Sequence, residues 1–314
     1  MRRARALLAA LLVAGLAPAT AGCGLGEGNE RAGGGAILRV TRDFGHEELG
    51  STSLGSVREG QTVMRMLRSQ FDVTTRFGGR FVQSIDGVNG RGAGGQVDWF
   101  YWVNGLEADR GAAEWEVLPG DRVQWDHRDW TAAMRVPAIV GAYPEPFASG
   151  IEGKRRPVRV ECEEIGSPPC DEARQRLRDE GVSTSGSSLG APGTEAVTRL
   201  VVARWPRARV VRGAAGLEDG PETTGVFARF SSDGNTLELL DEHGETARRV
   251  TRGEGVGLVL ALQPRAEELV WIVTALDDEG LDSGVRALDE GRLRDAFAVA
   301  ATGDRVEKLP LVSR

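Results

Sequence analysis

The sequence predicts an α+β protein with two domains, and three features of the chain support this prediction. Residues 36–132 contain several strand patterns around a single helical pattern. Residues 157–314 alternate between strand and helix patterns, as the chain does in an α/β sandwich. Residues 133–156 are rich in proline and glycine, which predicts a linker or an irregular cover over the first domain.

The first predicted domain places strands on both sides of its helix. Apolar and polar residues alternate from Ala36 to Thr41, as in a half-buried strand, and apolar residues recur at helical spacing over 59–71. Further strands are predicted at 71–75, 80–85, 99–103 and 122–126. A sheet with one covering helix, in this order, is the layout of a β-grasp (ubiquitin-like) domain.

The second predicted domain begins at Pro157 and has a less certain strand order. Its strand patterns lie at 157–161, 209–211, 225–230, 257–262 and 268–275. Its helical patterns lie at 171–180, 195–205, 283–288 and 293–300, and a small-residue loop is predicted at 183–193. We therefore predict an α/β sandwich whose fold and role the patterns do not specify further.

The first 22 residues have the features of a secretory signal peptide. Arg2, Arg3 and Arg5 precede an apolar run over 6–17, and small residues follow. The apolar run is too short to span a bilayer core of about 30 Å. We therefore expect residues 1–22 to be removed during export.

The end of this segment, Thr20-Ala21-Gly22-Cys23, resembles the lipobox of bacterial lipoproteins, although leucine is more usual at the position of Thr20. The resemblance implies that Cys23 is acylated and anchors the protein to membrane lipid outside the cytoplasm. Each buried methylene of such an anchor contributes about 0.8 kcal/mol. The glycine-rich residues 23–35 are then a flexible tether. The alternative is an ordinary secretory signal in which Cys23 occurs by chance.

The cysteine count agrees with export. Three cysteines are an odd number, and if Cys23 carries lipid, Cys162 and Cys170 remain as one disulfide pair. The Pro168-Pro169 turn between them brings a disulfide within reach, and the alternative is two reduced, buried thiols.

Composition and motifs exclude several functions. The chain has 39 basic and 46 acidic residues, which argues against nucleic acid as a partner. None of its three histidines lies at metal-ligand spacing from another histidine or a cysteine, and there is no Gly-x-Ser-x-Gly nucleophile elbow. We predict no metal, no cofactor and no catalytic residue, with the second domain the less certain part. The basic run Lys154–Arg156 is interpreted as linker solubility or contact with anionic lipid.

Aromatic residues are concentrated near the end of the first domain. Five of the seven tryptophans lie within 32 residues, at Trp99, Trp102, Trp115, Trp125 and Trp130. Successive side chains of a strand face opposite sides of its sheet, so Trp99 and Tyr101 share one face and Trp102 takes the other. We expect one set to fill the core and the other to remain available for a partner. The alternative is that both sets are covered.

Three motifs resemble a bacterial domain-of-unknown-function family that is related to the carboxy-terminal domain of transcobalamin and intrinsic factor. They are Phe81–Val88, Trp99–Gly105 and Pro119–Val123, within about a third of the chain. Tyr101 and Trp102 match the Tyr-Trp pair of that family, whose domain lies over one face of cobalamin against a separate helical barrel. The patterns of this sequence do not predict such a barrel. The resemblance implies a β-grasp fold, cobalamin as a candidate ligand and a membrane importer as a candidate partner.

The leading hypothesis is therefore a lipid-anchored, extracytoplasmic binding protein that captures a small molecule, such as a corrinoid or another vitamin, for an importer. Its predicted ligand-binding residues are Trp99, Tyr101, Trp102 and Asn104. The alternative hypothesis is a cell-envelope module for protein interaction or adhesion, without a small ligand. An enzyme with its site in the second domain is the weakest hypothesis.

Overall fold

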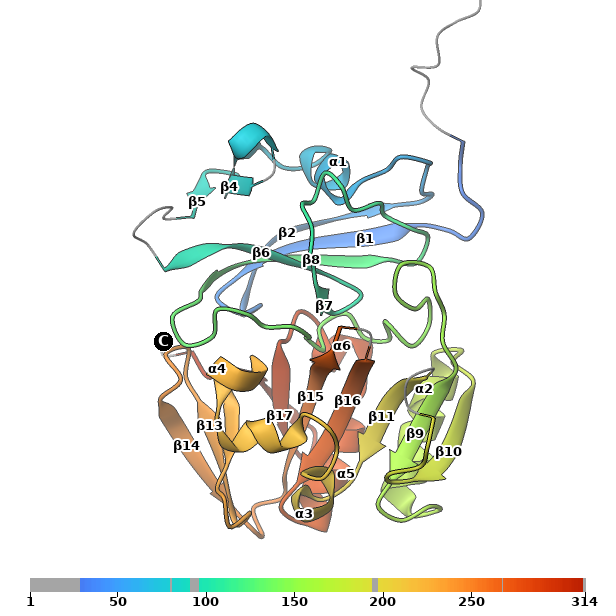
Figure 1. Ribbon diagram of the computed structural model, residues 1–314, viewed down its shortest axis with the longest axis vertical. Coiled ribbons are helices and arrows are strands. Elements are labelled where there is room, and N and C mark those ends of the chain that lie inside the picture. Colours follow the sequence, from blue (N-terminus) through green and yellow to red (C-terminus); the bar gives the residue numbers. More distant parts are fainter. Residues whose placement is uncertain (1–28, 80, 91–95, 194–196, 267, 313–314) are drawn as a thin grey trace, which may run out of the picture.

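The computed structural model describes residues 29–312 except 80, 91–95, 194–196 and 267. The signal peptide predicted at 1–22, the lipidation site Cys23 and the first part of the predicted tether lie outside the described residues. No helix in the described part of the chain is long and apolar enough to cross a membrane. The fold is mixed α/β, with more strands than helices and several sheets. Two domains are stacked end to end (Figure 1).

The N-terminal domain is built on a five-stranded sheet with the order β2-β1-β8-β6-β7. Its strands are β1 (Ala36–Arg42), β2 (Glu47–Leu54), β6 (Val97–Val103), β7 (Leu106–Glu107) and β8 (Arg122–Asp129). Strands β1 and β8 are parallel neighbours at the centre, and β2 and β6 flank them antiparallel. Strand β2 was not predicted, because its glycine and serine residues hide the alternation of a strand.

One helix and a small second sheet cover the outer face of this sheet (Figure 1). They are α1 (Val63–Arg68), β3 (Val73–Arg76), the 3₁₀ helix η1 (Phe77–Gly79), β4 (Phe81–Ile85) and β5 (Val88–Asn89). Helix α1 is shorter than the predicted 59–71 because Thr62 caps it, its hydroxyl accepting a hydrogen bond from Arg65 N at 3.2 Å.

The C-terminal domain is built on a seven-stranded sheet with the order β10-β9-β11-β16-β15-β17-β18. The strands are β9 (Val158–Cys162), β10 (Thr184–Ser188), β11 (Thr198–Val202), β15 (Val256–Arg265), β16 (Glu268–Ala275), β17 (Ala298–Thr302) and β18 (Arg305–Leu309). The first four in the sheet order are parallel, and the last three are joined antiparallel.

Each face of this sheet has its own cover. One face packs against α2 (Pro168–Asp179) and α5 (Asp278–Arg286). The other packs against a three-stranded sheet and short helices, namely β12 (Ala228–Phe230), β13 (Thr236–Leu240), β14 (Thr246–Thr251), α3 (Trp205–Ala208), η2 (Ala214–Glu218) and α4 (Pro221–Thr224). A further short helix, α6 (Glu290–Leu293), precedes β17.

Several elements predicted for this domain were wrong. The helix predicted at 195–205 contains the strand β11, and the helix predicted at 293–300 runs from the end of α6 through a turn into β17. The loop predicted at 183–193 contains β10, and the strand predicted at 209–211 is irregular. A short, fully apolar run such as Leu200–Ala203 fits a buried strand as well as a helix, so its periodicity does not decide between them.

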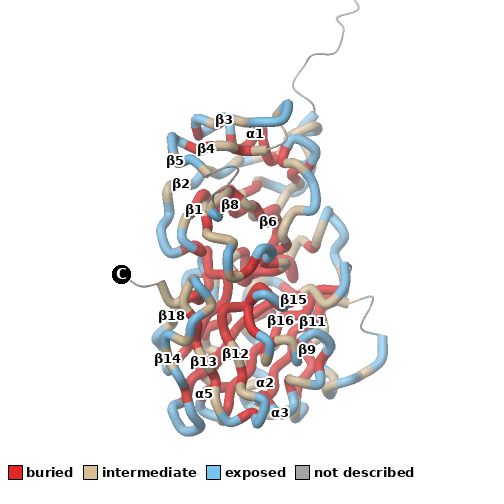
Figure 2. Tube along the Cα trace, turned by 60° about the vertical axis from the view of Figure 1, so that its left-hand side comes forward, coloured by how far each residue is buried: buried red, intermediate tan, exposed pale blue. Residues whose placement is uncertain are grey.

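The segment 133–156, predicted as a linker or an irregular cover, contains no helix or strand and is a packed part of the molecule. Val136 and Ile139 belong to the hydrophobic core on one side of the C-terminal sheet, and Val140, Tyr143 and Phe147 belong to the core on the other side. All five side chains are at most 1% exposed. Buried stretches of the Cα trace lie where the two domains meet (Figure 2).

Candidate functional site

The outer face of the sheet, which α1 covers, forms the core of the N-terminal domain together with residues of β6. Trp99 and Tyr101 are 5% and 8% exposed and lie in one cluster with residues of α1, β1 and β8. The ring of Tyr101 stacks on Trp125 with a centroid distance of 4.7 Å, and its hydroxyl donates to Arg110 O at 2.6 Å. Burial raises the pKa of Tyr101 far above its ordinary value. The indole N–H of Trp99 donates to Val88 O at 3.0 Å.

The opposite face of β6 joins the C-terminal domain. Trp102 is fully buried, packs edge-on against Phe297 at 5.0 Å between ring centroids, and donates its indole N–H to Val136 O at 2.8 Å. Phe44, from the turn after β1, inserts beside it between Phe227 and Phe297. These rings belong to the same hydrophobic core as one face of the C-terminal sheet.

Asn104 is also an internal, structural residue. Its amide nitrogen donates to Asp121 Oδ1 and to Gly150 O, each at 2.8 Å, and its amide oxygen accepts from Arg122 N at 2.8 Å. It has a left-handed backbone, with φ of 52°, at the turn between β6 and β7. With these bonds in place, the side chain is 1% exposed and has no contact to offer a ligand.

The expectation that one aromatic face stays available for a partner is therefore wrong. All four predicted ligand-binding residues, Trp99, Tyr101, Trp102 and Asn104, are buried. The physical reason is that the C-terminal domain covers the second face of the N-terminal sheet, so both faces are cores. The prediction of a disulfide is confirmed, because Cys162 at the end of β9 is bonded to Cys170 at the start of α2.

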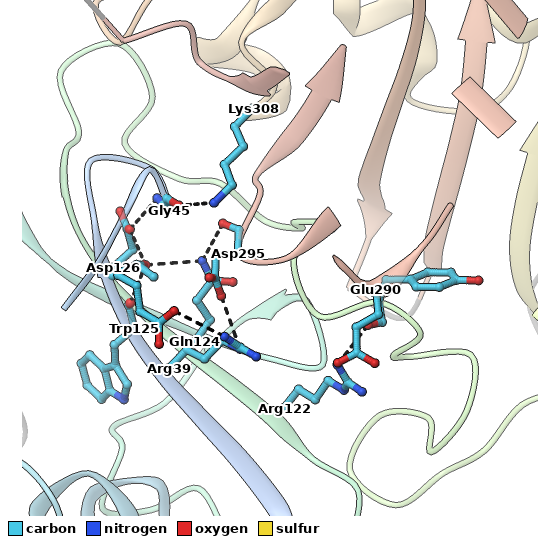
Figure 3. A network of polar contacts seen from close by, with 12 residues as sticks. Arg39, Gly45, Arg122, Gln124, Trp125, Asp126, Glu290, Asp295 and Lys308 are labelled. Carbon is cyan, nitrogen blue, oxygen red and sulfur yellow. Dashed lines mark hydrogen bonds and ion pairs between the residues drawn. The ribbon is translucent and has the colours of Figure 1, made fainter. Parts of the chain in front are cut away.

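A turn of the N-terminal domain is held in place by a buried carboxylate (Figure 3). Asp126 accepts hydrogen bonds from Phe44 N at 3.0 Å, Gly45 N at 2.8 Å and the Thr41 hydroxyl at 2.6 Å. Burial raises its pKa to about 6. A β-carbon at Gly45 would lie 1.8 Å from Asp295 O of the other domain, so this close approach requires glycine.

Further polar contacts of the junction surround that turn (Figure 3). Lys308 on β18 donates to Gly45 O, and Gln124 donates to Asp295 O at 2.9 Å. Arg122 forms a salt bridge with Glu290 at 2.7 Å. Hydrogen bonds, ion pairs and packed rings thus join the two domains.

A cleft opens at one side of the junction, and residues of both domains line it. It has a volume of about 670 Å³. Its walls come from β7 and the following loop, from two parts of the 133–156 segment and from the β15–β16 turn. The charged side chains that line it are Glu107, Asp109, Arg110, Arg135, Glu152, Lys154, Arg156, Arg265 and Glu268.

The cleft carries both signs of charge in a definite arrangement. Arg110 is paired with Asp109 at 3.0 Å and with Glu152, and Arg135 is paired with Glu107 at 3.0 Å. Lys154 has no salt bridge within the described part of the chain. Arg110 and Arg135 were not predicted as site residues, and Lys154 was predicted as linker charge, because no local sequence pattern indicates which loops lie together in the fold.

The described residues hold no group of three or more histidine, cysteine, aspartate or glutamate side chains that could bind a metal ion. The ring nitrogens of His46 and His127 contact Pro310 O at 2.8 Å and Asn89 O at 3.1 Å. Burial lowers the pKa of both histidines, which favours the neutral form of each ring. Their contacts are those of structural residues.

Comparisons with known proteins give a family for a part of the chain. Residues 60–128 match a family described as a domain of unknown function, DUF4430. No curated protein matches the chain significantly. One similar solved structure is a protein from Ruminococcus gnavus ATCC 29149, provisionally described as metal binding. It is 15% identical with a TM-score of 0.26, over 31% of this chain and 97% of that chain.

Proposed function

We propose that this protein is a non-enzymatic, lipid-anchored binding protein outside the cytoplasm, and that its ligand lies in the cleft at the domain junction. The observation that carries the proposal is the cleft itself, which segments from both domains line with charged groups. Binding sites commonly form at such domain junctions, where a few converging polar groups fix the ligand.

The lining indicates the class of ligand. Lys154 and the cations Arg110 and Arg135 stand beside the carboxylates Glu107 and Glu152. A small polar molecule with both a negative and a positive group can pair with both signs of this lining. A corrinoid is less favoured, because the aromatic rings that would face it are buried.

The fold and the anchor complete the proposal. The parallel pair of β1 and β8 at the centre of the sheet, with α1 across it, supports a β-grasp domain of the transcobalamin-related kind. The lipobox-like Thr20–Cys23 supports attachment to membrane lipid. An anchored binding protein of this kind would serve a membrane importer.

Binding is tested with the mature protein and a panel of small zwitterionic molecules, followed by calorimetry. We expect Lys154→Met to weaken binding about 10-fold or more, because a charge-assisted hydrogen bond contributes about 1.5–3 kcal/mol. Arg252→Gln, at an exposed site outside the lining of the cleft, is the control. Binding that Lys154→Met leaves unchanged would refute the cleft as the site.

The anchor is tested separately. Cys23→Ser should move the protein from the membrane fraction to the soluble fraction after cell lysis. If the variant stays as membrane-bound as the parent, acylation of Cys23 is not the anchor. This result leaves the cleft proposal unaffected.

A second candidate function is protein interaction at the cell envelope, and Phe77 favours it. The side chain is 82% exposed at the tip between β3 and β4, and its φ of 53° is left-handed. A photo-crosslinking residue at position 77 should capture a distinct envelope protein if this tip is an interface. A crosslinker at exposed Ile165 in the other domain is the matched control.

A further inference from the structure

A buried chain of alternating charges crosses one face of the C-terminal sheet. The guanidinium of Arg199 on β11 forms two hydrogen bonds with Glu161 on β9, at 2.9 and 2.7 Å, and one with Glu268 on β16 at 3.2 Å. The second oxygen of Glu268 contacts Arg212 at 3.4 Å. The side chains of Arg199, Glu161 and Glu268 are 5%, 0% and 6% exposed.

Among the described residues, this row of charges contains three arginines and two carboxylates. Arg159 lies 3.9 Å from Glu161, so Arg159, Arg199 and Arg212 share the two carboxylates of Glu161 and Glu268. Among the described side chains, one positive charge is therefore left without a carboxylate of its own, and the half-exposed Arg212 places it within reach of a counter-ion.

A hollow lies directly over the buried charges. It has a volume of about 620 Å³, with Arg199 and Glu268 among its lining residues. The loop Leu189–Pro192 and the stretch Val210–Arg212 line it as well, and Arg207 adds another positive charge. Arg207 has no salt bridge in the part of the chain that the structure describes.

The arginines of this hollow have free donors. A guanidinium has five N–H donors. The side chain of Arg212 is 50% exposed and contacts only one oxygen of Glu268 among the described salt bridges. The planar donor fork of arginine matches the oxygens of a carboxylate or a phosphate, which it binds with two parallel hydrogen bonds.

We propose that this hollow is a binding site for a small oxyanion, a phosphate or carboxylate group, held by Arg207 and Arg212 above Arg199. The anion neutralises the excess charge that Glu161 and Glu268 leave. The site is distinct from the junction cleft and does not depend on the proposed function, although Glu268 lines both hollows.

Calorimetric titration of the mature protein with inorganic phosphate and, separately, with succinate tests the proposal. Saturable binding of either anion at millimolar or lower concentration is expected, and the tighter anion identifies the group. The double variant Arg207→Gln and Arg212→Gln should weaken it at least 10-fold, whereas Arg252→Gln, at an exposed arginine outside the hollow, should not.

A lysine variant separates recognition from charge. Arg207→Lys with Arg212→Lys keeps both positive charges but loses the donor forks, so its affinity should lie between the parent and the glutamine variant. Circular dichroism should show all variants folded, because both arginines are exposed. The absence of saturable binding for both anions, or unchanged affinity in the glutamine variant, would overturn the proposal.

Discussion

The two faces of β6 have the same kind of residues and different tasks. Trp99 and Tyr101 on one face pack inside the N-terminal domain, where helix α1 covers them. Phe100 and Trp102 on the other face pack against the C-terminal domain and the 133–148 segment. The comparison teaches that an aromatic strand can stabilise its own domain with one face and join a second domain with the other.

The largest expected effect comes from removing the ring that joins the domains. Trp102→Ala leaves a cavity at the junction and should lower the free energy of unfolding by about 3–5 kcal/mol, the usual cost of truncating a buried tryptophan. Trp99→Ala should cost a similar amount. Only Trp102→Ala should also increase hydrogen exchange in residues 136–147. Equal exchange in the two variants would contradict the idea that Trp102 stabilises the domain junction and Trp99 does not.

A change within the C-terminal domain provides a reference for these effects. Replacing Cys162 and Cys170 by serine removes the disulfide bond, which joins two residues 8 positions apart in the sequence. The loss of loop constraint should lower the free energy of unfolding by about 2–3 kcal/mol. Denaturant titration measures this loss, and hydrogen exchange of residues 97–103 should not change. If it rises, the domains are coupled more tightly than their contacts indicate.

The pH dependence of stability reports on the face that joins the domains. Burial raises the pKa of Asp126 from 3.8 to about 6, so the folded protein binds this proton at a higher pH than the unfolded chain does. The raised pKa of Asp126 by itself should therefore increase the free energy of unfolding by about 1–3 kcal/mol as the pH falls from 7 towards 4, whereas the lowered pKa values of His46 and His127 oppose this increase. Buried Asp121, with a pKa of about 6, acts in the same direction.

The variant Asp126→Asn distinguishes the contribution of Asp126 to the pH dependence of stability from that of Asp121. The part of the pH profile that Asp126 contributes should disappear in this variant, and the remainder belongs to the other carboxyls whose pKa burial raises, Asp121, Glu145 and Asp295 among them. Denaturant titrations at several pH values measure both amounts. A pH profile that Asp126→Asn leaves unchanged would show that Asp126 does not titrate in this range.

The smallest expected effect comes from a polar contact of the junction. Arg122→Gln removes the salt bridge with Glu290, whose side chains are 22% and 40% exposed. Water screens such a pair, so the free energy of unfolding should fall by less than about 1 kcal/mol. A loss as large as that of Trp102→Ala would show that ion pairs, rather than rings, dominate the junction.

The sequence predicted the parts of this fold that have a clear local period. The alternation in Ala36–Thr41 and the aromatic run at 99–103 correspond to β1 and β6, and the disulfide followed from counting cysteines. Short apolar runs such as Leu200–Ala203 led to wrong predictions, because such a run occurs both in buried strands and in buried helices.

The candidate sites could not be predicted in the same way. The cleft brings Arg110, Arg135 and Lys154 together from separate loops, and the oxyanion site joins Arg199 to Arg207 and Arg212 through the sheet. No spacing pattern in the sequence predicts that these residues lie close together in the fold. The burial of Trp102 depends on how one domain docks on another, which local periodicity does not contain.

The turn that inserts Phe44 has a consequence for any attempt to divide the molecule. A fragment that ends at residue 132 would present Phe44, Phe100 and Trp102 to water, together with the buried acid Asp126. Such a fragment should self-associate through its newly bare apolar surface. The stretch that matches the known family, residues 60–128, therefore depends on the C-terminal domain to cover one face of its sheet.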